Sequence, residues 1–186
     1  MAEQGRCVAI VGAESTGKTH LAQALAGALR ERTGQRVGWV PELLRDWCDA
    51  QGRTPQAHEQ AAILRAQHEH IAAAAAQHDW VVCDTTGLMT AVYSRLVFGD
   101  GSLDGLAGQL HRRDAALTLL TALDLPWVPD GLQRDGPQVR GPVDQALRQL
   151  MQAQGVAYSV VRGEGPARLA DALQTVTPLL GETAAR

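Results

Sequence analysis

The residues best suited to chemistry form one octet near the start of the chain. It reads Gly12-Ala13-Glu14-Ser15-Thr16-Gly17-Lys18-Thr19. The octet matches G-x-x-x-x-G-K-[ST], a loop whose backbone N–H groups surround nucleotide phosphates. Lys18 is the chain's only lysine, and its compact ammonium suits a phosphate slot better than a planar guanidinium. The sequence therefore predicts that the octet binds ATP, with Lys18 catalytic and Thr19 offering a hydroxyl to Mg²⁺.

Two carboxylates and an arginine are expected beside this loop. Residues 80–84 read as a buried strand ending in Asp84, and residues 36–40 as a strand followed by Glu42 and Arg45. Ligands of a parallel sheet bind beyond the carboxyl ends of its strands, so these side chains should reach the octet. Asp84 is predicted to hold Mg²⁺; the alternative is a helix N-cap. Glu42 is either the base for an acceptor hydroxyl or a helix-start carboxylate.

A later segment carries two further candidate catalytic residues. Residues 126–141 read as a loop rich in Pro, Gly, Asp and Arg, and they include Arg134 and Arg140. Arginines on a mobile loop can close over a transferring phosphoryl group and offset its developing charge. The alternative is an ordinary solvated surface loop.

Strands alternate with helices along the chain. Strands are expected at 7–11, 36–40, 80–84, 117–121 and 158–161, and helices after the octet and at 54–78, 88–98, 143–154 and 167–180. Thr54 and Pro55 should begin the helix at 54–78. The alternation predicts an α/β fold of the P-loop NTPase type, a five-stranded parallel sheet flanked by helices. We expect one P-loop kinase domain over residues 1–181 and a loose tail over 182–186.

Composition restricts the partners. The net charge is -3 and the pI about 6.0, whereas a nucleic-acid surface needs clustered positive charge. No apolar run approaches the roughly 18 residues of a membrane span, and no export signal is recognisable. Cys7, Cys48 and Cys83 lack paired metal spacing and are expected as reduced, partly buried thiols. The sequence thus predicts a cytoplasmic protein that binds small molecules, without nucleic-acid or membrane partners.

Four segments together resemble a known family. They are the octet with Val11 before it, Pro41-Glu42 with Arg45, Asp84-Thr85, and Asp124-Leu125-Pro126-Trp127-Val128-Pro129-Asp130-Gly131-Leu132. This pattern resembles the ribosylnicotinamide kinase domain of bacterial NAD-biosynthesis regulator proteins, which also occurs alone as a kinase of NAD metabolism. The resemblance runs from Val8 to Arg168. It implies a P-loop kinase fold, ATP with Mg²⁺, and phosphorylation of the ribose 5′-hydroxyl of nicotinamide riboside.

The resemblance also implies an acceptor site. Its expected substrate-binding residues are Glu42, Arg45, Trp47, Thr85, Trp127 and Asp130. A nicotinamide ring is flat and, in the riboside, cationic, so it should stack on Trp47 and Trp127. Trp39 and Trp80 lie within strands and are expected in the core. The chain departs from the family's usual aromatics at Leu43 and Trp47, and these departures bear on the base pocket.

Other functions remain as alternatives. Another nucleoside or nucleotide kinase would share the fold and differ in its acceptor pocket. A non-catalytic ATP-binding sensor would need no acceptor-side base such as Glu42. A regulatory GTPase is disfavoured, because guanine is usually read by Asn-Lys-x-Asp and the chain has no asparagine and no second lysine. A motor-type ATPase usually has Glu after its metal-binding Asp, where this chain has Thr85.

Overall fold

A computed structural model describes residues 5–129 and 136–181 of the chain. The strands of these residues are β1 (Arg6–Val11), β2 (Val37–Val40), β3 (Trp80–Asp84), β4 (Ala115–Thr121) and β5 (Ser159–Val161). They form one sheet in the order β2-β3-β1-β4-β5, and every pairing is parallel. The predicted α/β fold with a five-stranded parallel sheet is confirmed.

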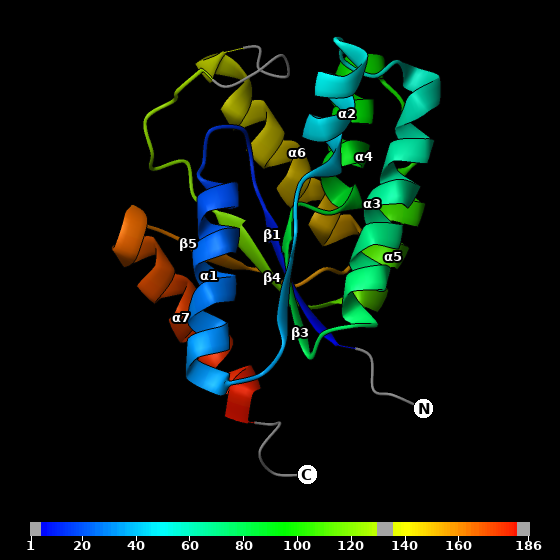
Figure 1. The fold of residues 1–186 in the computed structure, drawn as a ribbon. Helices are drawn as coiled ribbons and strands as arrows, with labels where there is room; N and C mark the ends of the chain where they lie inside the picture. Colours follow the sequence, from blue (N-terminus) through cyan, green and yellow to red (C-terminus); the bar gives the residue numbers. More distant parts are fainter. Residues whose placement is uncertain (1–4, 130–135, 182–186) are drawn as a thin grey trace.

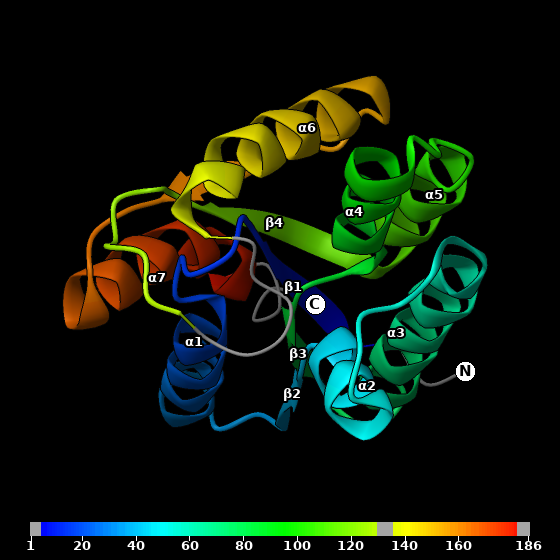
Figure 2. The same cartoon turned by 90° about the horizontal axis from the view of Figure 1, so that it is seen from above.

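Helices cover both faces of this sheet. They are α1 (Lys18–Thr33), α2 (Leu43–Gln51), α3 (Gln60–Ala75), α4 (Gly87–Phe98), α5 (Asp104–Asp114), α6 (Arg140–Ala153) and α7 (Gly165–Gly181), with short 3-10 turns η1 (Ala57–Glu59) and η2 (Pro137–Val139). Helices α1 and α7 lie on one face and α3, α4, α5 and α6 on the other, as the two views in Figures 1 and 2 show. No helix in the described ranges has both the length and the apolar character needed to span a membrane.

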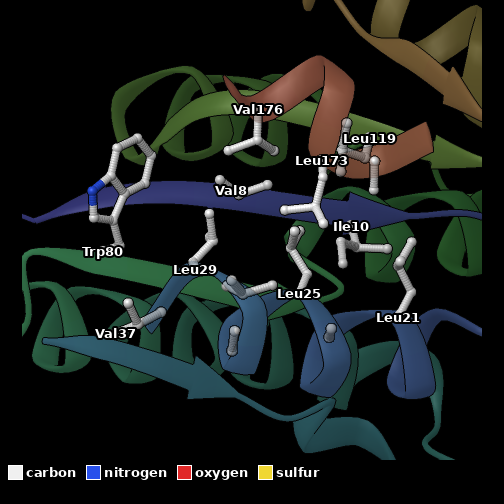
Figure 3. Close-up of a cluster of buried hydrophobic side chains, with 14 of the residues drawn as sticks. Val8, Ile10, Leu21, Leu25, Leu29, Val37, Trp80, Leu119, Leu173 and Val176 are labelled. Carbon is white, nitrogen blue, oxygen red and sulfur yellow. The ribbon is translucent and has the colours of Figure 1, made fainter. Parts of the chain in front are cut away.

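The core under α1 fixes where the octet lies. Leu21, Leu25 and Leu29 recur at helical spacing and pack against Val8 and Ile10 of β1 (Figure 3). Each fully buried side chain of this size contributes roughly 1.5–3 kcal/mol. Packing therefore anchors α1 to β1, and the octet between them must lie at the carboxyl edge of the sheet, the upper end in Figure 1.

Two of the predicted boundaries are wrong. Helix α3 begins at Gln60, after η1, and not at Thr54. Gln56 and Glu59 form the capping box of η1: the Glu59 carboxylate accepts a hydrogen bond from the Gln56 backbone N–H at 2.8 Å. Helix α6 begins at Arg140, so the predicted loop over 126–141 ends earlier than expected.

The tryptophans of the strands differ in burial. Trp80 is buried, as expected, and its Nε1 donates to Gln35 Oε1 at 2.8 Å. Trp39 is 37% exposed, so its expected core position is wrong. The reason is its place on β2, an edge strand, where a side chain within a strand can still face solvent. Cys7, Cys48 and Cys83 are free and buried, more so than the sequence suggested.

Candidate active site

The octet forms a loop with unusual backbone angles. Gly12, Ser15 and Gly17 have φ values of 153°, 52° and 75°. A Cβ added at Gly12 would lie 2.0 Å from the Thr121 hydroxyl oxygen, so only glycine fits there. Ser15 lies in the left-handed region without being glycine, which costs on the order of 1–3 kcal/mol and is typical of ligand-binding loops. Left-handed residues in a loop turn its N–H groups toward an anion.

Two buried threonines hold this loop in shape, Thr16 within the loop and Thr121 at the end of β4. Thr16 Oγ1 donates to the Ala13 carbonyl at 2.7 Å and lies 2.7 Å from Thr121 Oγ1. Both threonine side chains are buried, and Thr121 in turn contacts the Val11 carbonyl at 3.3 Å. The loop is therefore held in shape before any ligand binds, which lowers the entropy cost of binding.

Arg168 braces the same loop from α7, and sequence reasoning did not single it out. It is 3% exposed, and its guanidinium donates to the Thr16 carbonyl, to Asp124 and to the Gly163 carbonyl, the last at 2.7 Å. Asp124 also accepts from the Gly163 N–H at 2.8 Å. The contact with Thr16 spans 152 residues, so no local motif marks it.

Thr19 and Asp84 face each other, as the metal prediction requires. Thr19 Oγ1 donates to Asp84 Oδ2 at 2.5 Å. Asp84 is 1% exposed, and its Oδ1 has no hydrogen-bond partner among the described residues. A buried carboxylate oxygen without a partner is costly, and a divalent cation would satisfy it. Thr86, not Asp84, is the N-cap residue of α4, because its hydroxyl accepts from the Leu88 N–H at 3.4 Å.

Lys18 lies at the start of α1 with its side chain turned back over the loop. Its Nζ donates to the Ala13 carbonyl at 2.9 Å. Gly17 is the N-cap residue of α1 and has no side chain, so no N-cap side chain covers the first backbone N–H groups of the helix. An ammonium and a helix N-terminus beside each other favour bound phosphate.

The acceptor candidates border a cleft of about 440 Å³ above the loop. Its lining consists of Ser15, Thr16, Gly17, Lys18, Thr19, His20, Glu42, Arg45, Leu125, Pro126, Val128, Pro129 and Glu164. Glu42 and Arg45 form an ion pair of 4.0 Å between Oε2 and Nη2. Glu42 is at the N-cap position of α2 but makes no side-chain cap hydrogen bond. A carboxylate at a helix start that lines a cleft is placed to accept a proton from a bound hydroxyl.

The other predicted acceptor residues that the structure describes, Thr85, Trp47 and Trp127, are not in the lining of this cleft. Thr85 directly follows Asp84 and has φ of 74°. Trp47 is half-buried on α2, with the Arg53 guanidinium 5.0 Å from its ring centre. Trp127 is half-buried between two lining residues, and its buried Nε1 has no hydrogen-bond partner among the residues that the structure describes. Asp130 and Arg134 fall outside the described residues.

Arg140 is buried at the start of α6, not on the mobile loop where the sequence predicted it. It is 9% exposed, and its Nη1 donates to the Leu125 carbonyl at 2.8 Å. Its Nε and Nη2 are buried and have no hydrogen-bond partner in the described structure. Nearby, the Val128 N–H donates to Ser15 Oγ at 2.8 Å. The segment from Leu125 to Val128 is thereby attached both to α6 and to the octet loop.

A second cleft, of about 530 Å³, shares Gly17, His20, Leu125 and Glu164 with the first. It is lined by Gly17, His20, Leu21, Ala24, Leu125, Glu164, Gly165, Pro166, Arg168 and Leu169. Most of this lining is apolar, and it adjoins the start of α1. A flat apolar group attached to a phosphate chain on the loop would fit here.

Residues 7–168 match the AAA_28 family, which is described as an AAA domain. The chain belongs to this family. A search of curated proteins finds no match. Among solved structures, NadR protein in complex with NAD and AMP-PNP has a TM-score of 0.76 at 19% identity, and NadR protein in complex with NR has 0.77 at 19%. Each alignment covers 95% of this chain, but only 50% and 52% of the NadR chains.

Thymidylate kinase from Ehrlichia chaffeensis is also similar, with a TM-score of 0.65 at 18% identity over 95% of this chain and 100% of that one. The resemblance seen in the sequence is thus confirmed, and at these identities it establishes the fold. This member of the AAA family has the fold of P-loop nucleoside and nucleotide kinases.

Proposed function

We propose that the chain is an ATP- and Mg²⁺-dependent kinase that phosphorylates the 5′-hydroxyl of nicotinamide riboside, giving nicotinamide mononucleotide. The observation that carries this proposal is the placement of Glu42 and Arg45 in the same cleft as Lys18 and Thr19. A nucleotide-binding loop alone serves many functions, whereas a carboxylate across the cleft gives an acceptor hydroxyl its base. NadR structures that contain NR and AMP-PNP share the fold and support this choice of acceptor.

The donor half of the site binds ATP through the octet. Lys18 contacts the β- and γ-phosphates once it leaves the Ala13 carbonyl, and the apolar cleft beside Arg168 receives the adenine base. Thr19 and Asp84 hold Mg²⁺, which neutralises charge on the phosphate oxygens when bound. The partnerless Asp84 Oδ1 fits this assignment.

The acceptor half orients one hydroxyl toward the γ-phosphate. Glu42 accepts the proton of that hydroxyl, and Arg45 holds the Glu42 carboxylate in place. We expect the two Arg140 nitrogens without a partner among the described residues to offset charge on the phosphate chain. We expect Thr85, Trp47, Trp127 and Asp130 to contact the nucleoside, and Arg134 to offset charge on the transferring phosphoryl group. The three free thiols and the use of ATP support a cytoplasmic location.

A nucleotide kinase is the second candidate, because thymidylate kinase shares the fold over its full length. One screen separates the candidates: ATP and Mg²⁺ are supplied with nicotinamide riboside, common nucleosides or nucleoside monophosphates, and ADP release is measured. The proposal predicts the highest kcat/KM for nicotinamide riboside. A preference for a monophosphate would establish the second candidate, and ATP binding without transfer to any acceptor would establish a sensor.

A further inference from the structure

A buried histidine connects the turn after β3 with strand β4. His111 of α5 is 4% exposed. Its Nδ1 lies 3.0 Å from Thr86 Oγ1, and its Nε2 lies 2.7 Å from Thr118 Oγ1. Both ring nitrogens are therefore engaged, one as donor and one as acceptor when the ring is neutral. A buried polar group that is fully satisfied on two sides fixes the relative position of the elements it joins.

The turn that His111 contacts runs from Asp84 to Thr86. Between them Thr85 has φ of 74°, which a β-branched residue rarely adopts. On one side of the turn, the Thr85 N–H donates to the Ile10 carbonyl at 2.9 Å. On the other side, Thr86 begins α4 and is held by His111. Such a backbone persists only where its surroundings hold it in place.

We propose that His111 is a positioning residue that holds the Asp84–Thr86 turn, so that the Asp84 carboxylate faces Thr19 and the Mg²⁺ of a bound nucleotide. It touches neither substrate nor metal and acts through Thr86. The inference rests on the proposed function in one respect, because it takes Asp84 as the metal-holding carboxylate. It is independent of which acceptor the enzyme uses.

The chemistry of the ring suggests matched variants. Burial lowers the pKa of His111 to about 4, so the ring is neutral near pH 7. His111→Gln keeps one donor and one acceptor in a side chain that can still bridge two hydroxyls. His111→Leu keeps an apolar group of similar size without either. Thr118→Val removes only the anchor on β4 and retains the contact with Thr86.

The test measures ATP affinity by calorimetry with and without Mg²⁺, in the absence of any acceptor. His111→Leu should weaken the binding of ATP with Mg²⁺ roughly 10-fold, the lower end of the range for groups that orient a metal ligand, and leave metal-free ATP binding unchanged. His111→Gln should restore most of the Mg²⁺ effect. Thr118→Val should also weaken the binding of ATP with Mg²⁺, but by a smaller factor than His111→Leu.

The control is Val176→Ala, a core change on α7 at the opposite face of the sheet. It should lower Tm without changing the effect of Mg²⁺. If His111→Leu lowers Tm but leaves the effect of Mg²⁺ on ATP affinity unchanged, His111 has only a structural role and the inference is overturned. If His111→Leu does not fold, an unchanged Mg²⁺ effect in Thr118→Val overturns it equally. Failure to phosphorylate any acceptor, with these binding results intact, would refute the proposed function and leave the inference standing.

Discussion

The Thr19 hydroxyl donates to the Asp84 carboxylate at 2.5 Å, joining the first turn of α1 to the end of β3. The two residues are 65 positions apart, yet the sheet brings them together. In the parallel register Asp84 pairs with Ile10, two residues before the octet begins. The carboxylate and the phosphate-binding loop therefore leave adjacent strands at the same edge, which is the place where ligands of such sheets bind.

Asp84→Asn should separate metal use from nucleotide binding. An amide retains the shape of the carboxylate but loses its charge, so the Mg²⁺ concentration for half-maximal activity should rise and kcat should fall about 100-fold or more. Titration of activity with Mg²⁺ at saturating ATP measures both. Asp79→Asn, which alters an exposed partner of Arg36, is the matched control. Wild-type Mg²⁺ dependence in Asp84→Asn would refute the metal assignment.

Lys18→Ala should keep the fold and lose the chemistry. Lys18 is half-buried and bonded to the Ala13 carbonyl, so its removal leaves no cavity in the core. Its charge acts on the β/γ-phosphates, and we expect kcat to fall about 1000-fold or more. Lys18→Arg should also fail, because a guanidinium is too wide for the loop. Steady-state kinetics beside circular dichroism decide this, and near-normal turnover in either variant would exclude the phosphate-binding role.

Local sequence patterns predicted the strands, most helices and the residues that meet at the carboxyl edge of the sheet. The octet, the strand ending in Asp84 and the pair Glu42 and Arg45 are each short, contiguous signals. Once the strands are parallel, geometry places these signals at one edge. The sequence left open whether Asp84 caps the following helix. The structure was needed to decide this, because the backbone turn after Asp84 makes Thr86 the N-cap residue of α4.

Long-range contacts could not be predicted in the same way. Arg168 meets Thr16 across 152 positions, and His111 meets Thr86 across 25, so neither contact leaves a periodic pattern. Trp39 was misplaced because a strand segment does not reveal whether it lies at the edge of its sheet. Arg140 was misplaced because its burial depends on a bond to the Leu125 carbonyl, 15 residues earlier.

Glu42→Gln should affect transfer and spare ATP binding. Glu42 lines the cleft and forms its ion pair with Arg45, and an amide cannot take a proton from the acceptor hydroxyl. We expect kcat to fall roughly 100-fold, within the usual range for loss of a general base, with the Kd for ATP nearly unchanged. Glu31→Gln, an exposed change on α1, is the control. Wild-type kinetics would mean that Glu42 is only a helix-start carboxylate.

Trp127→Ala should raise the KM for nicotinamide riboside roughly 10-fold, as expected for a lost stacking contact of about 1.4 kcal/mol. Trp47→Ala is predicted to do the same. Arg53 already lies over one face of the Trp47 ring. Comparing the KM for the riboside in Trp47→Ala and Arg53→Ala shows whether the riboside binds to the face that Arg53 covers. Kinetic titration of each substrate is run beside thermal denaturation. A lowered Tm with unchanged KM for the riboside would contradict the stacking role.

Acid should destabilise the protein partly through His111. Burial lowers the pKa of its imidazole from 6.5 to about 4, while Asp114 raises that pKa and Arg112 lowers it by smaller amounts. Between pH 6.5 and about 4, the unfolded chain therefore binds a proton at this site that the folded chain does not. The contribution of His111 to the free energy of unfolding is fully present above pH 6.5. As the pH falls to about 4, the free energy of unfolding decreases through this site by about 3 kcal/mol in total.

His111→Gln removes this titration and retains a donor and an acceptor for the two hydroxyls, so the variant isolates the contribution of His111 from that of other titrating groups. The free energy of unfolding, from urea titrations between pH 4.5 and 7, should fall more steeply in the wild type than in the variant. The difference in slope should approach about 1.4 kcal/mol per pH unit. Equal slopes would mean that the buried imidazole is protonated as readily as an exposed one, contrary to the effect of its burial.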